Sequence, residues 1–301
     1  MRDVSSKYQT LRTARAAATL RVAASTIEAI QSGNVPKADP VGVARVAGIQ
    51  AAKNTATLLP YCHQVPLDYV GIDIVLEAAS IVVTTEVKAI WKTGVEMEAL
   101  VAASVASLTL YDMLKGIDDG MEIGTVRLLE KKGGTSDIKA SGSGMAAAVL
   151  VISDSVHAGT RTDTSGRLAV ERQKGLGFHV TRYKYIPDDR TMIEQELREL
   201  TDSRSVDLII TTGGTGVGQR DVTPEATNAI IDRRLGGVEE VLRTFGRDRT
   251  PTAMLSRGVA GTCGHTLVVN LPGSKTGVED GMSALFPAIF HAFAVMRGEG
   301  H

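Results

Sequence analysis

The chain is poor in cysteine, in aromatic residues and in net charge. Its 301 residues include two cysteines, Cys62 and Cys263, too few for a disulfide framework, a CxxC metal site or a cysteine-ligated iron–sulfur cluster held by this chain alone. Aromatic residues make up 4%, which leaves little to stack single-stranded nucleic acid. The 33 Lys and Arg nearly balance the 34 Asp and Glu, so no basic field attracts nucleic acid or anionic lipid. We therefore expect neither nucleic acid nor a membrane as partner.

We expect neither a leader nor a membrane span. Its start, MRDVSSKYQT, has no apolar core of the signal-peptide kind, and no apolar run reaches the roughly 18–20 residues that a span requires. We expect a cytoplasmic protein. With 43% apolar and 22% charged residues, the composition is that of a folded globular protein, and its length predicts two modest domains or one large one.

A break in composition near residue 139 indicates two domains. The stretch KASGSG, residues 139–144, is small, flexible and polar, and an apolar strand pattern follows it directly, as expected of a linker between folded units. We predict a first domain at 1–138, a linker at 139–145 and a second domain at 146–301.

The first domain mixes helical patterns with alternating ones. Amphipathic periodicity predicts helices at 12–33, 40–60 and 95–115, and alternation predicts strands at 66–79, 80–90 and 122–130. The two alternating runs adjoin in sequence and read as antiparallel neighbours. This mixture predicts an α+β domain with a ferredoxin-like antiparallel sheet covered by helices.

In the second domain, strand patterns alternate with helical ones. The strand patterns lie at 146–155, 178–189, 205–216 and 265–275, and helical segments separate most of them. Such alternation predicts an α/β, doubly wound and mostly parallel sheet with helices on both faces. Ligands of such sheets bind outside the carboxyl ends of the strands.

A glycine-rich loop follows the third of these strands. Residues 211–221 read TTGGTGVGQRD, and Thr223 and Pro224 then cap and open a helix. Exposed main-chain N–H groups before a helix cradle phosphate, and a carboxylate such as Asp221 suits Mg²⁺. The spacing is neither that of Walker A nor that of the Rossmann fingerprint. Alone the loop fits a tight turn equally well, but the following Arg-Asp and Thr-Pro-Glu favour an anion site.

Polar residues also follow the other strands. Pro272, Gly273, Ser274 and Lys275 stand where a helix would start, Asp154 and Ser155 follow the first strand, and Asp188 follows the second. Each alone is as readily a glycine turn, a solvated lysine or a surface carboxylate. Four polar loops at one sheet edge favour a ligand site.

The segment TTGGTGVGQRDVTPEAT together with NLPGSK resembles the molybdopterin-binding fold of the MogA/MoaB family of molybdenum cofactor biosynthesis, over about 146–297. The resemblance implies that this domain binds molybdopterin and transfers the adenylyl group of Mg-ATP to its terminal phosphate. Asp188 and Asp221 would be catalytic and would hold Mg²⁺. The implied substrate-binding residues are Asp154, Ser155, Gly213, Gly214, Thr215, Gly216, Thr223, Pro272, Gly273, Ser274 and Lys275. The alternative is a pterin-binding or scaffold module without catalysis.

In the first domain KADPVGVARVAGIQAAKNTATLLPYCHQVPL, KTGVEMEALVAASVASLTLYDMLK and GTVRLLEKKGG resemble the MoaC family of cyclic pyranopterin monophosphate synthases. The resemblance implies that a cyclic dihydro-GTP derivative is converted to cyclic pyranopterin monophosphate with release of pyrophosphate, without a cofactor. Lys37 and Lys115 would be the general acid/base lysines and Asp112 their partner. Arg12, Lys53, Cys62, His63, Glu96, Glu98 and Lys131 would bind substrate. Proton transfer suits a lysine whose pKa is lowered by burial or by nearby cations.

Spacing along the predicted helix at 95–115 raises a question of assembly. Glu98 and Asp112 would lie roughly 21 Å apart on one straight helix, too far to share one small ligand. We therefore hypothesise a site shared between protomers, to be tested by mixing a Lys37→Ala chain with a Lys115→Ala chain. The two resemblances imply a homo-oligomer, with hexamers for the first domain and trimers for the second.

Overall fold

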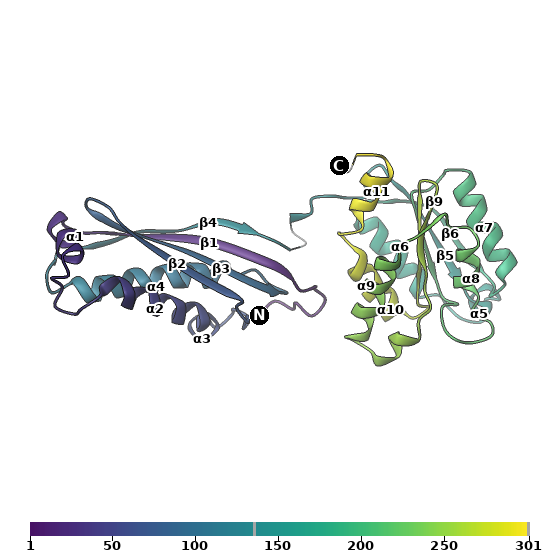
Figure 1. The fold of residues 1–301 in the computed structure, drawn as a ribbon. Helices are drawn as coiled ribbons and strands as arrows, with labels where there is room; N and C mark the ends of the chain where they lie inside the picture. Colours follow the sequence, from purple (N-terminus) through teal and green to yellow (C-terminus); the bar gives the residue numbers. More distant parts are fainter. Residues whose placement is uncertain (135–136, 300–301) are drawn as a thin grey trace. The chain divides into compact units, whose positions relative to one another are not determined.

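The computed structural model describes residues 1–134 and 137–299. The chain forms two compact units, residues 1–137 and 138–301 (Figure 1), and each is described by itself. The last strand of the first unit ends at Lys132, and the first strand of the second unit begins at Ala146.

The first unit is a four-stranded antiparallel sheet with helices. In chain order its elements are β1 (Thr10–Arg21), α1 (Ala24–Gln31), α2 (Pro40–Lys53), α3 (Thr55–Leu58), β2 (Tyr69–Leu76), β3 (Ser80–Trp91), α4 (Glu96–Leu114) and β4 (Glu122–Lys132). The strand order is β2-β3-β1-β4, and each neighbouring pair is antiparallel. This β-α-β-β-α-β arrangement confirms the ferredoxin-like α+β class.

The predicted helix at 12–33 was wrong over its first half, where the chain forms β1. This segment, TLRTARAAATLR, is rich in alanine, which has the highest intrinsic helix propensity. Tertiary structure overrides that preference, because β1 is an inner strand paired with both β3 and β4. Ala14, Ala16, Ala18 and Leu20 are fully buried and alternate along it. Only the second half of the predicted helix exists, as α1.

Helices α2 and α4 cover one face of this sheet (Figure 1). The helices meet through small residues: a Cβ added at Gly48 of α2 would lie 3.0 Å from the Ala102 carbonyl and 3.1 Å from the Ala106 Cβ of α4. Among the residues that the structure describes, α4 is the one helix long and apolar enough by length and composition to cross a membrane, although the sequence predicted no such run. Its buried alanines and leucines belong to the core of this unit.

The second unit is a six-stranded mixed sheet. Its elements are β5 (Ala146–Ile152), α5 (Asp154–His157), α6 (Ser165–Gly175), β6 (His179–Ile186), α7 (Arg190–Asp202), β7 (Leu208–Thr212), α8 (Thr223–Asn228), β8 (Arg233–Arg234), α9 (Gly236–Arg247), η2 (Pro251–Leu255), β9 (Ala260–Cys263), β10 (Thr266–Leu271), α10 (Lys275–Leu285) and α11 (Phe290–Met296). The strand order is β6-β5-β7-β10-β9-β8.

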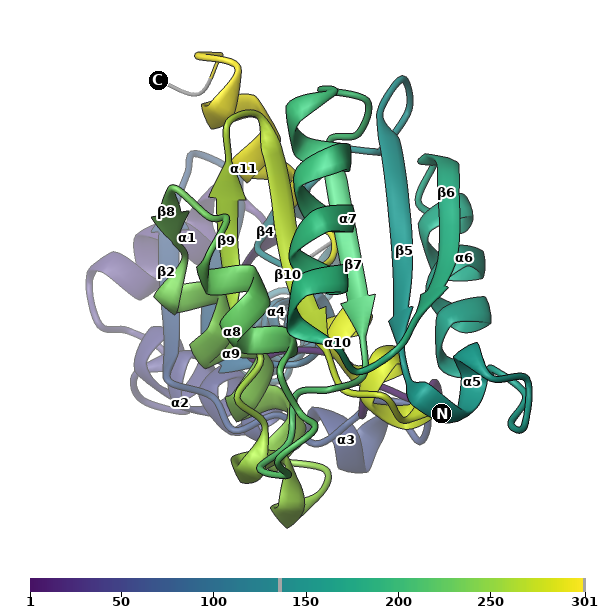
Figure 2. The ribbon, with the colours of Figure 1, turned by 90° about the vertical axis from the view of Figure 1, so that its right-hand side faces the viewer.

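Four parallel strands, β6, β5, β7 and β10, form the body of this sheet. Strand β9 pairs antiparallel with β10, and β8 pairs antiparallel with β9. Helices α6, α9, α10 and α11 pack on one face and α7 and α8 on the other, which Figure 2 shows with this unit facing the viewer. The predicted mostly parallel, doubly wound α/β class is confirmed. The carboxyl ends of β5, β6, β7 and β10 therefore meet at one edge.

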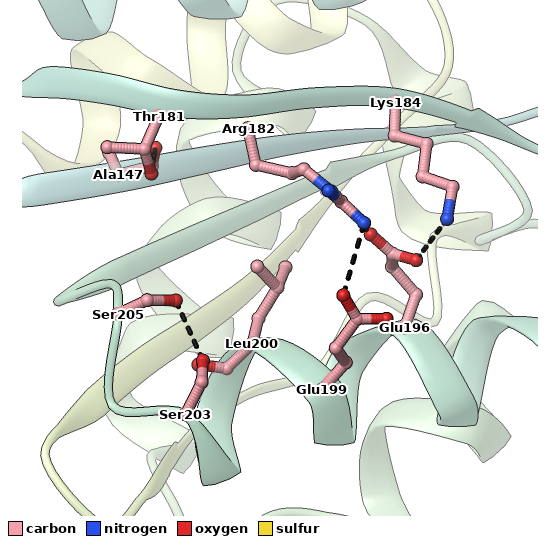
Figure 3. A network of polar contacts seen from close by, with 9 residues as sticks. All are labelled: Ala147, Thr181, Arg182, Lys184, Glu196, Glu199, Leu200, Ser203 and Ser205. Carbon is pink, nitrogen blue, oxygen red and sulfur yellow. Dashed lines mark hydrogen bonds and ion pairs between the residues drawn. The ribbon is translucent and has the colours of Figure 1, made fainter.

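An ionic network joins α7 to the edge strand β6. Glu196 of α7, 4% exposed, accepts hydrogen bonds from Arg182 (2.9 Å) and Lys184 of β6. Arg182 also donates to Glu199 (3.3 Å), whose side chain is 60% exposed. Figure 3 shows the two cations of β6 directed at the two glutamates of α7. The network therefore ties α7 to the edge of the sheet.

Candidate active sites

In the first unit Lys37, Asp112 and Lys115 lie together. The Lys37 ammonium donates to the Asp112 carbonyl at 2.8 Å and to its carboxylate at 3.0 Å. The Lys115 ammonium pairs with the other carboxylate oxygen at 2.8 Å. All three side chains are exposed, so their charged groups are accessible to a ligand.

Local backbone geometry orients this group. Lys37 precedes Ala38, whose φ of 63° is left-handed and rare for a residue other than glycine. Asp39 then caps α2 by accepting the Gly42 N–H at 2.9 Å. Lys115 is the C-cap residue of α4, where its cation faces the negative end of the helix dipole.

Lys115 does not have the lowered pKa that proton abstraction was expected to require. Hydrogen bonds from Lys115 and Lys37 lower the pKa of Asp112 to about 2. The same hydrogen bond to Asp112 raises the pKa of Lys115. The Lys115 side chain is exposed, so the desolvation that would lower its pKa is outweighed by the hydrogen bond to Asp112 and by the charge of Asp112. In a single chain this arrangement suits a proton donor held protonated by its carboxylate partner.

A second group lies at the opposite end of α4. Glu96 pairs with Lys131 of β4 at 3.4 Å. Glu98 is 4% exposed, and burial, with a smaller contribution from Glu96, raises its pKa. Burial and then the charge of Glu98 raise the pKa of Cys62. Cys62 therefore lies near Glu98, at this end of α4.

Three more predicted residues have different surroundings. Arg12 is 7% exposed and donates to the carbonyls of Trp91, Lys92 and Gly133 at 3.0–3.3 Å, so its cation ties three chain segments together. Lys53 is exposed in the last turn of α2. His63 is half-buried beside Cys62 in the segment after α3.

The structure therefore divides the predicted first site in two. Lys37, Asp112 and Lys115 lie at the C-terminal end of α4, and Glu96, Glu98, Cys62 and Lys131 lie at its N-terminal end. Because α4 is one continuous helix from Glu96 to Leu114, the premise of the roughly 21 Å separation along the helix holds.

In the second unit the glycine-rich loop closes around Asp221. The Gly218 N–H donates to the Asp221 carboxylate at 2.7 Å. A Cβ at either Gly216 or Gly218 would lie 2.8 Å from the same carboxylate oxygen, so the absence of a side chain lets the loop wrap the acid. Thr223, fully buried, donates its hydroxyl to the Gly213 carbonyl at 2.9 Å and holds the start of the loop.

The second loop touches the first through its backbone. A Cβ at Gly273 would lie 3.1 Å from the Gly213 Cα, and Thr212 donates its hydroxyl to the Pro272 carbonyl at 2.9 Å. Ser274 caps α10 by accepting the Gly277 N–H at 3.0 Å. Lys275 begins that helix with an exposed side chain. Thr215, by contrast, is 5% exposed.

Two carboxylates on neighbouring strands bind each other's main chain. The Asp154 N–H donates to the Asp188 carboxylate at 2.9 Å, and the Asp188 N–H donates to the Asp154 carboxylate at 3.0 Å. Arg220 binds Asp154 at 2.7–3.1 Å, and this hydrogen bonding lowers the pKa of Asp154. Burial first, and then the charges of Asp154 and Asp221, raise the pKa of Asp188. Ser155 lies beside this pair, 3.2 Å from the Ser153 hydroxyl.

Two cavities meet at these loops. One of about 440 Å³ opens between the loops, α9, η2 and α10, and the other, of about 400 Å³, opens toward β5 and the segment 161–165. Gly213, Gly214, Asp221, Gly273 and Ser274 line both, and Asp188 lines the second. Their shared wall is where two ligands would meet, beside carboxylates and main-chain N–H groups.

The fit of a metal rests on these carboxylates. No cluster of three or more His, Cys, Asp or Glu suited to a metal occurs within residues 1–134 and 137–299. Burial first, and then the charges of Asp154 and Asp221, raise the pKa of Asp188, and a cation there would offset both effects. Mg²⁺ typically binds one or two carboxylates and completes its shell with phosphate and water, which this pair fits.

Sequence reasoning assigned no individual role to three residues at this site. Arg220 lies within the quoted loop motif and was counted there only as part of the Arg-Asp pair that favours an anion site. Asp163, 4% exposed, accepts the Gly166 N–H at 2.9 Å and the Tyr183 hydroxyl, and lines the second cavity. Arg257, which follows η2, binds the glycine-rich loop at residues 41 and 36 positions earlier in the chain. No local pattern indicates Arg257, because its partners are distant in the chain. Asp163 had a local signal, since an Asp just before a helix accepts main-chain N–H groups of its first turn, here also that of Arg167 at 3.1 Å.

Comparison with known proteins assigns a family to each half. Residues 1–134 match the MoaC family, and residues 148–291 match a probable molybdopterin binding domain. These matches define the class as a MoaC domain joined to a molybdopterin-binding domain.

The full length matches as well. The chain is 42% identical over 301 residues to a molybdenum cofactor biosynthesis bifunctional protein of Chlorobaculum tepidum, covering 100% of this chain and 96% of that protein. The chain therefore belongs to the family of bifunctional molybdenum cofactor biosynthesis proteins, with a first domain of the cyclic pyranopterin monophosphate synthase type and a second of the MogA/MoaB type.

Each half is also similar to proteins of its own. Over 136 residues the chain is 51% identical to a cyclic pyranopterin monophosphate synthase of Novosphingobium aromaticivorans, covering 45% of this chain and 87% of that protein. The solved structure of the molybdopterin biosynthesis enzyme MoaB from Thermus thermophilus is 42% identical, with 51% of this chain and 97% of that chain covered and a TM-score of 0.49.

Proposed function

We propose that the first domain converts a cyclic dihydro-GTP derivative to cyclic pyranopterin monophosphate and pyrophosphate, with the Lys37–Asp112–Lys115 group moving the protons. The observation that carries this proposal is the single carboxylate of Asp112 bound by both lysines. Lys115, kept protonated by Asp112, would donate a proton to the rearranging ring system, and Lys37 would serve as its acid/base partner. Arg12, Lys53 and Lys131 would offset the charge of the departing pyrophosphate.

The test is formation of cyclic pyranopterin monophosphate by the full-length protein. We expect the Lys37→Ala and Lys115→Ala variants to lose turnover while the adenylyl transfer proposed below continues in the same preparation. Retention of full turnover in both variants would refute the assigned roles.

For the second domain we propose adenylyl transfer from Mg-ATP to the terminal phosphate of molybdopterin. The two cavities sharing one wall carry this proposal, because transfer requires two phosphorylated ligands side by side. Main-chain N–H groups of Gly214 and Gly216 and the capped start of α10 at Ser274 would hold phosphates. The Gly213 N–H donates to the Leu271 carbonyl at 3.1 Å, so Gly213 would line the site without binding phosphate through its N–H.

Asp188 and Asp221 would hold Mg²⁺, which supplies charge neutralisation between the approaching phosphates. Asp154 positions Asp188 through the reciprocal main-chain hydrogen bonds. Transfer joins the pterin phosphate oxygen to the α-phosphorus of ATP and breaks its bond to the β-phosphate, so pyrophosphate leaves and no protein nucleophile is required.

The deciding experiment measures ATP-dependent formation of adenylylated molybdopterin by the full-length protein, with Asp221→Ala for comparison. Product that disappears in Asp221→Ala supports an enzyme. Tight pterin binding without product in the wild type would instead identify a carrier module.

We further propose a homo-oligomer in which the two ends of α4 come from different protomers at each first-domain site. Mixing Lys37→Ala with Lys115→Ala cannot test this, because both lysines bind Asp112 within one chain. The informative mixture pairs Lys115→Ala with Lys131→Ala, which lie in the two separate groups. Restored turnover on mixing supports shared sites, and its absence from a mixed oligomer contradicts them. The cytoplasmic location stays a prediction.

A further inference from the structure

Arg257 makes an unusual set of contacts with the glycine-rich loop. It lies between η2 and β9, 41 positions after Gly216 and 36 after Asp221 in sequence. Its main-chain N–H donates to the Thr215 carbonyl at 2.8 Å. Its Nε donates to the Gly216 carbonyl and its Nη2 to the Asp221 carbonyl, both at 2.6 Å. One side chain thus binds the loop at two places, Gly216 and Asp221.

The third arm of the guanidinium reaches α8. Nη1 of Arg257 pairs with the Glu225 carboxylate, and this hydrogen bond lowers the pKa of Glu225 and keeps it ionised. Glu225 belongs to the short helix that Thr223 opens. Arg257 therefore connects Gly216 and Asp221 of the loop to the helix that follows the loop, using the planar fork of donors that arginine has and lysine lacks.

The loop has reason to require such a tie. Four of its residues between 213 and 221 are glycines, and glycine loses more conformational freedom on ordering than any other residue. Thr223 holds the beginning of the loop from inside, and Arg257 holds the distal part. Without the distal tie, the N–H groups of the loop and the main chain of Asp221 would sample many orientations.

Arg257 acts on the site from behind. Its neighbours Ser256 and Gly258 line the larger cavity, whereas Arg257 is among the lining residues of neither cavity described above. All four of the contacts given above go to the loop or to α8. Its guanidinium is thus committed to holding protein groups.

We propose that Arg257 is a positioning residue that pre-organises the glycine-rich loop and Asp221 for Mg-ATP. The inference rests on the proposed adenylyl transfer of the second domain. Its consequence is a division of labour: Asp221 meets the ligand, and Arg257 sets where Asp221 and the loop N–H groups stand before the ligand arrives.

The test uses the full-length protein in the variants Arg257→Ala, Arg257→Lys and Arg198→Ala. Arg198 is the matched control, because it also donates to a main-chain carbonyl, that of Ala229 at 3.0 Å, but away from the glycine-rich loop. Two quantities are measured: the dependence of adenylyl transfer on Mg-ATP, and amide hydrogen exchange of residues 213–221 against that of β10.

In Arg257→Ala we expect the KM for Mg-ATP and the half-saturating Mg²⁺ concentration to rise about tenfold or more, because the loop loses the charged hydrogen bonds that order it. Exchange should accelerate at 213–221 and stay unchanged in β10. Arg257→Lys should recover only part of the affinity, and Arg198→Ala should resemble the wild type.

Unchanged exchange at 213–221 in Arg257→Ala would overturn the inference, as would equal acceleration throughout the second domain, which marks general destabilisation. If the wild-type protein forms no adenylylated pterin, the proposed function fails. The exchange comparison, which needs no turnover, then still decides whether Arg257 orders the loop.

Discussion

The two domains build their sites from different materials. In the first, charged side chains at the two ends of one long helix carry the candidate chemistry, with Lys37, Asp112 and Lys115 at one end and Glu96 and Lys131 at the other. In the second, two glycine loops in backbone contact make the site, and the carboxylates stand beside them.

The difference follows from the two proposed reactions. Rearranging a ring system requires protons to be given and taken, which is the work of side chains with matched pKa values. Joining two phosphates requires charge neutralisation and orientation, which main-chain N–H groups and a cation supply. The first site should therefore be sensitive to removal of side chains, and the second to their addition at glycines.

The largest expected effect is on the first domain. Replacing Lys115 by Ala removes the proposed proton donor and should lower the turnover number for cyclic pyranopterin monophosphate about 10²- to 10⁴-fold. Adenylyl transfer by the same molecules should not change. A parallel loss of both activities would indicate unfolding or coupling between domains and would break the comparison.

In the second domain, adding a single methyl group at a loop glycine should lower activity. Gly216→Ala places a Cβ 2.8 Å from the Asp221 carboxylate, and we expect adenylyl transfer to fall about tenfold or more with little loss of stability. Gly236→Ala is the matched control, since nothing lies within 4 Å of a Cβ there. Equal activities of the two variants would show that the loop tolerates side chains.

A third prediction concerns stability away from the sites. Glu196→Gln should lower the free energy of unfolding of the second domain by roughly 1–3 kcal/mol, because the neutral amide keeps one acceptor oxygen and turns an NH2 donor toward one of the two cations. Glu199→Gln, on the same helix but exposed (Figure 3), should cost about 0.5 kcal/mol or less. Denaturant unfolding of both variants measures the difference, and equal losses would contradict the burial argument.

The Glu196 contribution should also depend on pH. Burial raises the pKa of Glu196, but hydrogen bonds from Lys184 and Arg182 outweigh it and leave the pKa below its ordinary 4.5. The folded state thus binds fewer protons than the unfolded state near this pH, so the contribution is present above about 4.5 and lost as acid protonates the folded carboxyl. The difference in the free energy of unfolding between wild type and Glu196→Gln should therefore become smaller at acid pH.

The smallest effect is a shift rather than a loss. In Asp112→Asn the carboxylate that raises the pKa of Lys115 disappears, so that pKa should fall. If Lys115 acts as an acid, the basic limb of the pH–rate profile of the first domain should move to lower pH. The profile of adenylyl transfer is the internal control. An unmoved basic limb would assign it to another group.

Local patterns in the sequence were sufficient for most elements and for the glycine loops. Alternation predicted β2 and β3, strand–helix rhythm predicted the parallel sheet, and the spacing TTGGTG before Thr223 and Pro224 predicted a loop that the structure places at the strand ends. These features depend on neighbours in sequence, since turn glycines, caps and periodicity act over a few residues.

Tertiary structure alone decided β1 and the hydrogen bonds between Arg257 and the glycine-rich loop. Alanine-rich β1 is a strand because it lies between β3 and β4 under a closely packed helix. Arg257 meets Gly216 and Asp221 because β9 returns beside β10. Each depends on contacts between residues far apart in the chain, whose energies no local window of sequence contains.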